Sequence, residues 1–116
     1  MLLQLNPESG LPLYIQIAAA VRRAVGDGEI SAGDRLPAAR DLAQSLDVNM
    51  HTVLRAYNDL RDEGLIELRR GRGAIVREGA AGPAAIHYMV VELAAEAIRQ
   101  GLSSDEVVAM VEKEFS

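Results

Sequence analysis

The sequence predicts a mainly α fold with one small β-hairpin. Two observations lead to this expectation. Apolar residues recur at helical spacing through most of the chain, and one short stretch holds two strand-like runs separated by glycines. A length of 116 residues allows one compact domain and a short appendage. Aromatic residues make up only 3%, so the core must be built from Leu, Ile, Val and Ala.

Two amphipathic segments open the chain. A first helix is expected from Pro12 to about Gly26, because proline suits the first turn of a helix and glycine ends it. A turn-rich stretch follows, and a second, short helix is expected after Pro37. Its buried face should contain the apolar residues Ala39, Leu42, Ala43 and Leu46.

A short break at residues 47–49 precedes a third helix, which should run to about Glu63. Asn49 stands where an N-cap belongs, with a side chain able to accept a hydrogen bond from the backbone N–H of Thr52. Gly64 should end this helix. Its buried stripe has the spacing i, i+3, i+4, i+7 and comprises Val53, Ala56, Tyr57 and Leu60.

Two strand-like runs, residues 65–69 and 73–77, then flank Arg70-Gly71-Arg72, where Gly71 and Gly73 permit a tight turn. Two short helices at a sharp turn, a leading helix and a following hairpin together form a winged helix-turn-helix. The sequence therefore predicts such a domain over residues 11–79, a fold typical of DNA binding.

A two-helix C-terminal dimerisation tail is expected over residues 84–116, after a linker of small residues at 78–83. Ser103 and Glu106 have the spacing of a capping box for the last helix. Two helices of this size bury too little surface alone, and an identical chain is the simplest partner. The expected dimerisation residues are Val90, Leu93, Ala97, Ile98, Val107, Val111 and Phe115.

The formal net charge is −5, which is unusual for a DNA-binding chain. The acidic excess lies mostly in the tail, since residues 80–116 hold two basic against six acidic side chains. Residues 1–79 are nearly balanced, with ten Arg against eleven acids. Residues 68–77 include four arginines, so the basic feature is local, and local clustering decides DNA attraction.

Several function classes find no support in the sequence. Absence of cysteine excludes disulfides and thiolate zinc sites, and the two histidines lie far apart. Phosphate-binding and nucleophile-elbow motifs are also absent, so neither an enzyme nor a cofactor is predicted. No apolar run is long enough to span a membrane, and a cytoplasmic location is expected.

Six blocks in order resemble the GntR-type DNA-binding domain over about residues 11–79. They are Pro12-Leu-Tyr-Ile-Gln-Ile, Gly33-Asp-Arg-Leu-Pro-Ala-Ala-Arg-Asp-Leu-Ala, Leu46-Asp-Val-Asn, Thr52-Val-Leu-Arg-Ala-Tyr-Asn-Asp-Leu, Glu63-Gly-Leu-Ile and Gly71-Arg-Gly-Ala-Ile-Val. With its short tail containing Gly-Leu-Ser, the chain is similar to the YtrA subfamily. This resemblance implies a sequence-specific transcription regulator, commonly a repressor linked to transporter genes, that binds a palindromic operator in double-stranded DNA as a homodimer.

Many family members carry Arg or Pro directly after the residue that matches Asn49, whereas this chain has Met50. An arginine base contact therefore does not carry over to this position. Met50 could contact a thymine methyl group or simply pack against the protein.

Candidate DNA contacts lie on both helices of the helix-turn-helix. Arg40 matches a family arginine that contacts DNA, although it could instead pair with Asp41 or Asp47 at the surface. On the third helix, the face opposite the buried stripe includes His51 and Arg55 near its N-terminus. For His51, a position on a solvated helix face is almost as good an interpretation as a base contact. Thr52 and the free backbone N–H groups suit phosphate oxygens.

The hairpin supplies the remaining candidates, Arg72 first, then Arg70 and Arg69, with Gly73 at the turn. A charge run is most often a solvated surface. At the tip of a hairpin that follows a recognition helix, contact with the groove or backbone is the stronger hypothesis. A winged helix used only for protein assembly is the alternative, and the arginine tip argues against it. The tail is too small for a separate effector domain, so any effector would bind at an interface.

Overall fold

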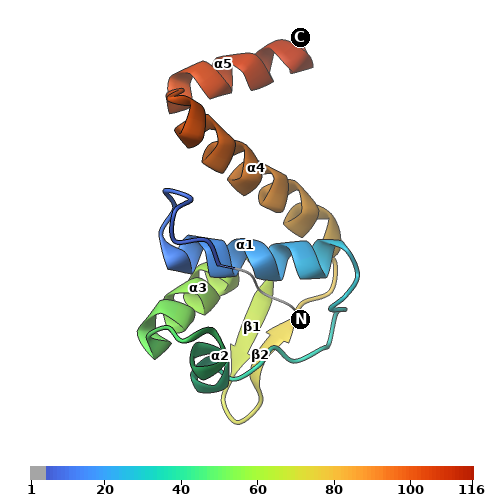
Figure 1. The fold of residues 1–116 in the computed structure, drawn as a ribbon. Coiled ribbons are helices and arrows are strands. Elements are labelled where there is room, and N and C mark those ends of the chain that lie inside the picture. The colour runs from blue at the N-terminus through green and yellow to red at the C-terminus, as the bar shows by residue number, and fades with distance from the viewer. Residues whose placement is uncertain (1–4) are drawn as a thin grey trace.

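The computed structural model describes residues 5–116, which form five helices and one two-stranded antiparallel sheet. The mainly α fold with a small hairpin is therefore confirmed (Figure 1). The elements are α1 (Leu13–Gly26), α2 (Ala39–Leu46), α3 (Met50–Asp62), β1 (Ile66–Arg69), β2 (Gly73–Val76), α4 (Ala81–Gln100) and α5 (Ser104–Phe115).

The core lies between α1, α2, α3 and the hairpin, and it is aliphatic as expected. The predicted stripe of α3 is buried along its whole length, with Val53, Ala56 and Leu60 fully covered. Tyr57 is also buried, and its hydroxyl donates a 2.7 Å hydrogen bond to the carbonyl of Pro37. This bond ties the segment before α2 to the middle of α3 and fixes the two helices of the motif.

The turn between α2 and α3 depends on Asp47, whose φ of +56° places it in the left-handed region. This conformation reverses the chain, and the N–H of Val48 returns to the carbonyl of Ala43 at 3.0 Å. Asn49 is the N-cap of α3 as expected, but its side chain accepts from the N–H of His51 at 2.8 Å and not from that of Thr52. A side chain that bonds two residues ahead makes an Asx-type turn.

The hairpin pairs Ile66 with Val76 and Arg69 with Gly73 at its two ends. Gly71 and Gly73 both have positive φ, as the tight turn requires. The segment before α2 adds to the sheet edge, because the N–H of Leu36 donates to the carbonyl of Ala74 at 2.8 Å. The wing is therefore anchored to the helix-turn-helix at its base, and only its loop projects.

Helix α4 begins at Ala81, three residues earlier than the expected Ala84, so Gly82 and Pro83 lie in its first turn instead of in a linker. Proline is compatible with this position, where its missing N–H has no intrahelical acceptor. The helix packs against α1 at close range, since a Cβ at Gly26 would lie 3.0 Å from the Cα of Ala85.

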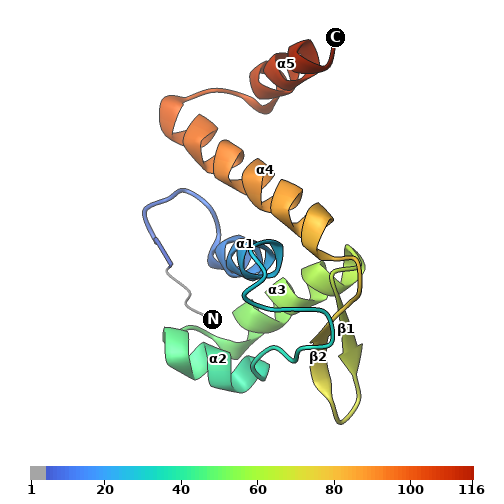
Figure 2. The same cartoon turned by 90° about the vertical axis from the view of Figure 1, so that its right-hand side faces the viewer.

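Helix α5 projects away from the rest of the molecule beyond the end of α4 (Figures 1 and 2). Gly101 ends α4 in the left-handed region, and the predicted capping box of Ser103 and Glu106 is present at the start of α5. No residue of α5 is buried within the described chain, residues 5–116. The direction of α5 is thus set by its turn and cap and not by packing.

Candidate nucleic-acid interface

The proposed contact residues come from α2, the first half of α3 and the wing. In both views α2 and the loop of the hairpin lie at the end of the molecule remote from α5 (Figures 1 and 2). The turn at Asp47 brings the end of α2 to the start of α3. The fold thereby brings together most of the residues that the sequence singles out for DNA contact.

Exposed arginines lie on both α2 and the wing of this surface. Arg40 on α2 and both Arg70 and Arg72 on the wing are exposed, and none of the three forms an ion pair with any residue of the described range 5–116. Arg40 is therefore not paired with Asp41 or Asp47. Unpaired guanidinium groups keep all of their donors available for phosphate or guanine oxygens.

Arg69 differs from the other wing arginines because it is paired within its own strand. Its Nε and Nη2 lie 2.8 and 2.7 Å from Oε2 of Glu67. Glu67 also lies 3.8 Å from Nε of Arg77. Arg69 and Arg77 are therefore in ion pairs, whereas the arginines in the hairpin loop form none with the described residues. The sequence contains a signal for the pair of Glu67 and Arg69, because residues two apart share one face of a strand.

The start of α3 presents side chains of different exposure. His51 is exposed, whereas Thr52 is half-buried. Met50 is half-buried and packs against the core, so its packing interpretation gains support. The Asn49 amide oxygen already accepts the N-cap hydrogen bond from the N–H of His51. Gly73 lies in the wing and has a φ of +77°.

Arg55 makes a contact that sequence reasoning missed. Its guanidinium carbon lies 3.7 Å from the ring centroid of Tyr14 on α1, and its Nη2 donates to the Tyr14 hydroxyl at 3.0 Å. The two residues are 41 positions apart, so no local pattern signals the pair. Among the arginines that the structure describes, Arg55 alone lies over an aromatic ring.

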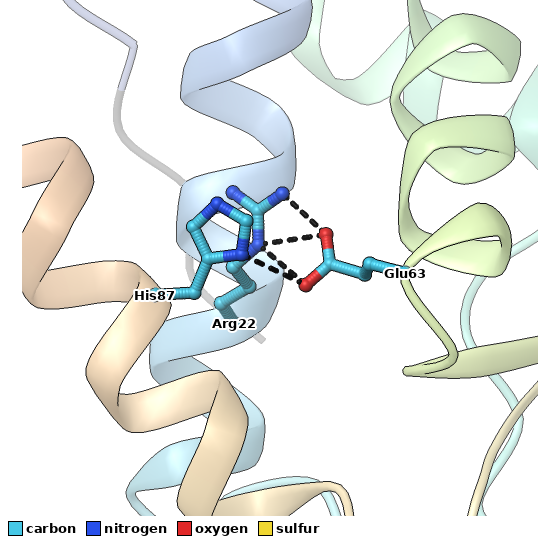
Figure 3. A network of polar contacts seen from close by, with 3 residues as sticks. All are labelled: Arg22, Glu63 and His87. Carbon is cyan, nitrogen blue, oxygen red and sulfur yellow. Dashed lines mark hydrogen bonds and ion pairs between the residues drawn. The ribbon is translucent and has the colours of Figure 1, made fainter.

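A second set of contacts that the sequence does not signal is a polar network that joins three helices (Figure 3). Glu63 caps the C-terminal end of α3, and its carboxylate accepts from the Arg22 guanidinium of α1, with Nε 3.0 Å from Oε1 and 3.1 Å from Oε2. Nη2 of Arg22 also reaches Oε1. Nδ1 of His87 on α4 lies 3.1 Å from Oε2. This network links α3 to α4, the helix that leads into the tail.

The described residues offer neither a metal-binding cluster nor a membrane-spanning helix. Among residues 5–116, no group of three or more His, Asp and Glu side chains lies close enough to hold a metal ion. No helix in this range combines the length and apolar character needed to cross a membrane.

Comparison with known proteins identifies the family. The family model described as "Bacterial regulatory proteins, gntR family" matches residues 13–76, more than half of the chain. The HTH-type transcriptional repressor YtrA of Bacillus subtilis is 39% identical over 79 residues, which are 68% of this chain and 61% of that protein. The chain thus spans about three fifths of the length of this relative.

Solved structures agree with this match. YtrA from Sulfolobus acidocaldarius, a GntR-family transcription factor, is 34% identical with a TM-score of 0.63, and the alignment covers 97% of this chain and 96% of that one. The DNA-binding domain of AraR in complex with operator ORR3 is 29% identical with a TM-score of 0.56, covering 66% of this chain and 92% of that one.

The matched residues include the helix-turn-helix and both strands of the wing. Proteins of this family are transcription regulators and not enzymes. By its sequence and by its winged-helix fold, the chain belongs to the gntR family of bacterial regulatory proteins.

Proposed function

We propose that this DNA-binding transcription regulator is a cytoplasmic repressor that binds a palindromic operator as a homodimer. The observation that carries the proposal is the set of unpaired, exposed arginines, Arg40, Arg70 and Arg72, on the two elements next to the recognition helix. The repressor role and control of transporter genes rest on the resemblance to the YtrA subfamily.

In this proposal α3 enters the major groove with its N-terminal half, where His51 and Arg55 face outward. Arg40 contacts guanine or phosphate from α2. The backbone around Thr52, next to the cap formed by Asn49, faces a phosphate, since a helix N-terminus favours negative charge.

The wing loop follows the recognition helix onto the DNA backbone or the adjacent groove. Arg72 and Arg70 supply the charge there, and Gly73 allows the turn. Arg69 contributes less, because its guanidinium is engaged by Glu67. Met50 supports the helix by packing and touches the DNA with its exposed part only.

The homodimer is proposed to form through α4 and α5, which leave most of their large apolar side chains uncovered. Ala97 is already buried and Val107 is half-buried. The exposed fractions of the other expected interface residues are 53% for Val90, 41% for Leu93, 49% for Ile98, 42% for Val111 and 88% for Phe115. Pairing with a second copy removes this apolar surface from water and presents two recognition helices to two half-sites.

The DNA contacts are tested by Arg40→Ala and Arg72→Ala, measured against an operator selected from genomic fragments at physiological salt. Each variant should bind about 5- to 150-fold more weakly, as expected for a lost specific arginine contact of about 1–3 kcal/mol. Arg61→Ala is the matched control, because Arg61 is an exposed arginine of α3 that pairs with Asp62 near the helix end. Wild-type affinity in both variants would refute the assigned interface.

The homodimer is tested in the full-length chain by Val111→Glu together with Phe115→Glu. Both side chains are exposed in the single chain, so the fold should be retained while the tail interface is lost. Light scattering should report a monomer, and operator affinity should fall steeply because one half-site remains. A variant that is still a dimer would place the interface elsewhere.

A further inference from the structure

Tyr14 and Arg55 form a contact across two helices of the winged helix-turn-helix. The Arg55 guanidinium carbon is 3.7 Å from the centre of the Tyr14 ring, and Nη2 of Arg55 donates to the Tyr14 hydroxyl at 3.0 Å. A cation over the face of an aromatic ring is attracted by the negative potential of that face. The planar guanidinium can stack on the ring and keep further N–H donors free at its edge.

The Tyr14 ring is partly enclosed by the core. It lies in the first turn of α1, is half-buried and packs against the core. One turn further along α1, Ile17 is fully buried, and Ala56 next to Arg55 is fully buried on α3. The two backbones that carry the contact are therefore held by the core, so the ring restrains the arginine and not the reverse.

We propose that Tyr14 is a positioning residue that holds the Arg55 guanidinium in one orientation for base contact and so contributes to operator specificity. The inference rests on the proposed function, in which α3 reads DNA. A free arginine side chain loses much of its rotamer freedom when it is fixed on binding. An arginine already stacked on a ring loses less of this freedom when it meets its base.

The contact also separates Arg55 from the other candidate arginines. Arg40 and Arg72 are exposed and form no ion pair with residues 5–116, so no charged partner fixes the direction of their guanidinium groups. A bidentate contact with guanine demands one plane and one direction. Tyr14, one of three tyrosines in the chain, supplies this restraint to Arg55.

The test is a double-mutant cycle in the full-length protein, with affinity measured for the selected operator and for unrelated DNA of equal length. Tyr14→Leu keeps an apolar side chain and removes the ring, and it should weaken operator binding about two- to fivefold. Tyr14→Phe keeps the ring and should recover most of this loss. Affinity for unrelated DNA should be unchanged in both variants, because no base contact is involved there.

The second arm of the cycle asks whether Tyr14 acts through Arg55. In an Arg55→Ala background, Tyr14→Leu should cause no further loss, because no guanidinium remains for the ring to hold. An equal loss in this background would show that Tyr14 acts independently and would overturn the proposal.

Two controls separate this inference from the proposed function. Thermal melting must show that each variant is folded, and if Tyr14→Leu is not, Tyr14→Met replaces it in both arms of the cycle, because methionine also removes the ring. If Arg55→Ala binds as the wild type does while Arg40→Ala does not, the positioning proposal fails and the proposed function stands. If Arg55→Ala, Arg40→Ala and Arg72→Ala all bind as the wild type does, both fail.

Discussion

The winged helix-turn-helix and α5 differ in how they are held in place. The former, α1 to α3 with the hairpin, surrounds a core in which Ile17, Val53 and Leu60 are fully buried. In α5 no residue is buried, and Phe115 is 88% exposed. Both segments have helical periodicity in the sequence, yet only one satisfies it within its own chain. Apolar periodicity predicts that a helix has a buried face without saying which molecule covers that face.

The largest effect should come from the ion pair inside the winged helix-turn-helix. Glu63→Ala removes the partner of Arg22, which is the only buried charged residue in the described range 5–116. An unpaired buried guanidinium should lower the free energy of unfolding by about 3–5 kcal/mol, measured by urea denaturation at pH 7. Glu96→Ala, which breaks the exposed pair with Arg99 on α4, is the control and should leave the midpoint unchanged. Equal losses in both variants would show that the burial of Arg22 does not make its ion pair more important than an exposed one.

The buried hydroxyl of Tyr57 extends the comparison to alkaline pH. Burial raises the pKa of this hydroxyl well above its ordinary value, so Tyr57 stays protonated in the folded chain when an unfolded tyrosine ionises near pH 10. The unfolded state then binds fewer protons, and stability should fall above pH 10 by about 1.4 kcal/mol per pH unit. Denaturation experiments between about pH 9.5 and 11, on either side of the ordinary tyrosine pKa, should show that Tyr57→Phe lacks this part of the decrease in stability with pH. An unaltered slope would mean that Tyr57 ionises while folded.

A smaller effect is expected at the turn between α2 and α3. Asp47 is the only residue other than glycine with positive φ in the described chain, residues 5–116. Asp47→Gly should raise the free energy of unfolding by at most about 1 kcal/mol, because relief of the left-handed strain is partly offset by glycine's entropy. Asp47→Val should lower it by about 1–2 kcal/mol. The two thermal shifts should therefore have opposite signs, and shifts of the same sign would contradict the strain.

The smallest effect should be found in α5. Phe115→Ala should change the stability of the monomeric chain by no more than about 0.5 kcal/mol, as for other exposed positions. The difference in melting temperature between Phe115→Ala and the wild type should then grow with protein concentration, because binding of a partner chain stabilises the folded state. A loss that is the same at every concentration would show that Phe115 packs within its own chain.

Local signals predicted much of the fold and part of the candidate site. The stripe of α3, the capping box at Ser103 and the glycine turn of the wing follow from spacing alone, because each involves neighbours in sequence. The start of α4 differs from the expectation because Pro83 suits both a linker and the first turn of a helix. The contacts of Arg55 with Tyr14 and of Arg22 with Glu63 join residues 41 positions apart. Only the packing of α1 against α3 creates them, and no periodicity encodes it.

The bond between Arg22 and Glu63 also constrains how this chain can evolve. Loss of either partner alone leaves a charge without its counterpart, whereas joint replacement by apolar residues of similar volume is often tolerated. Single substitutions at these positions should therefore be purged, and the two positions should change together among related sequences. His87, which is half-exposed and supplies a third contact, is free of this constraint and should vary. Across the family, the two positions should therefore be kept together or replaced together.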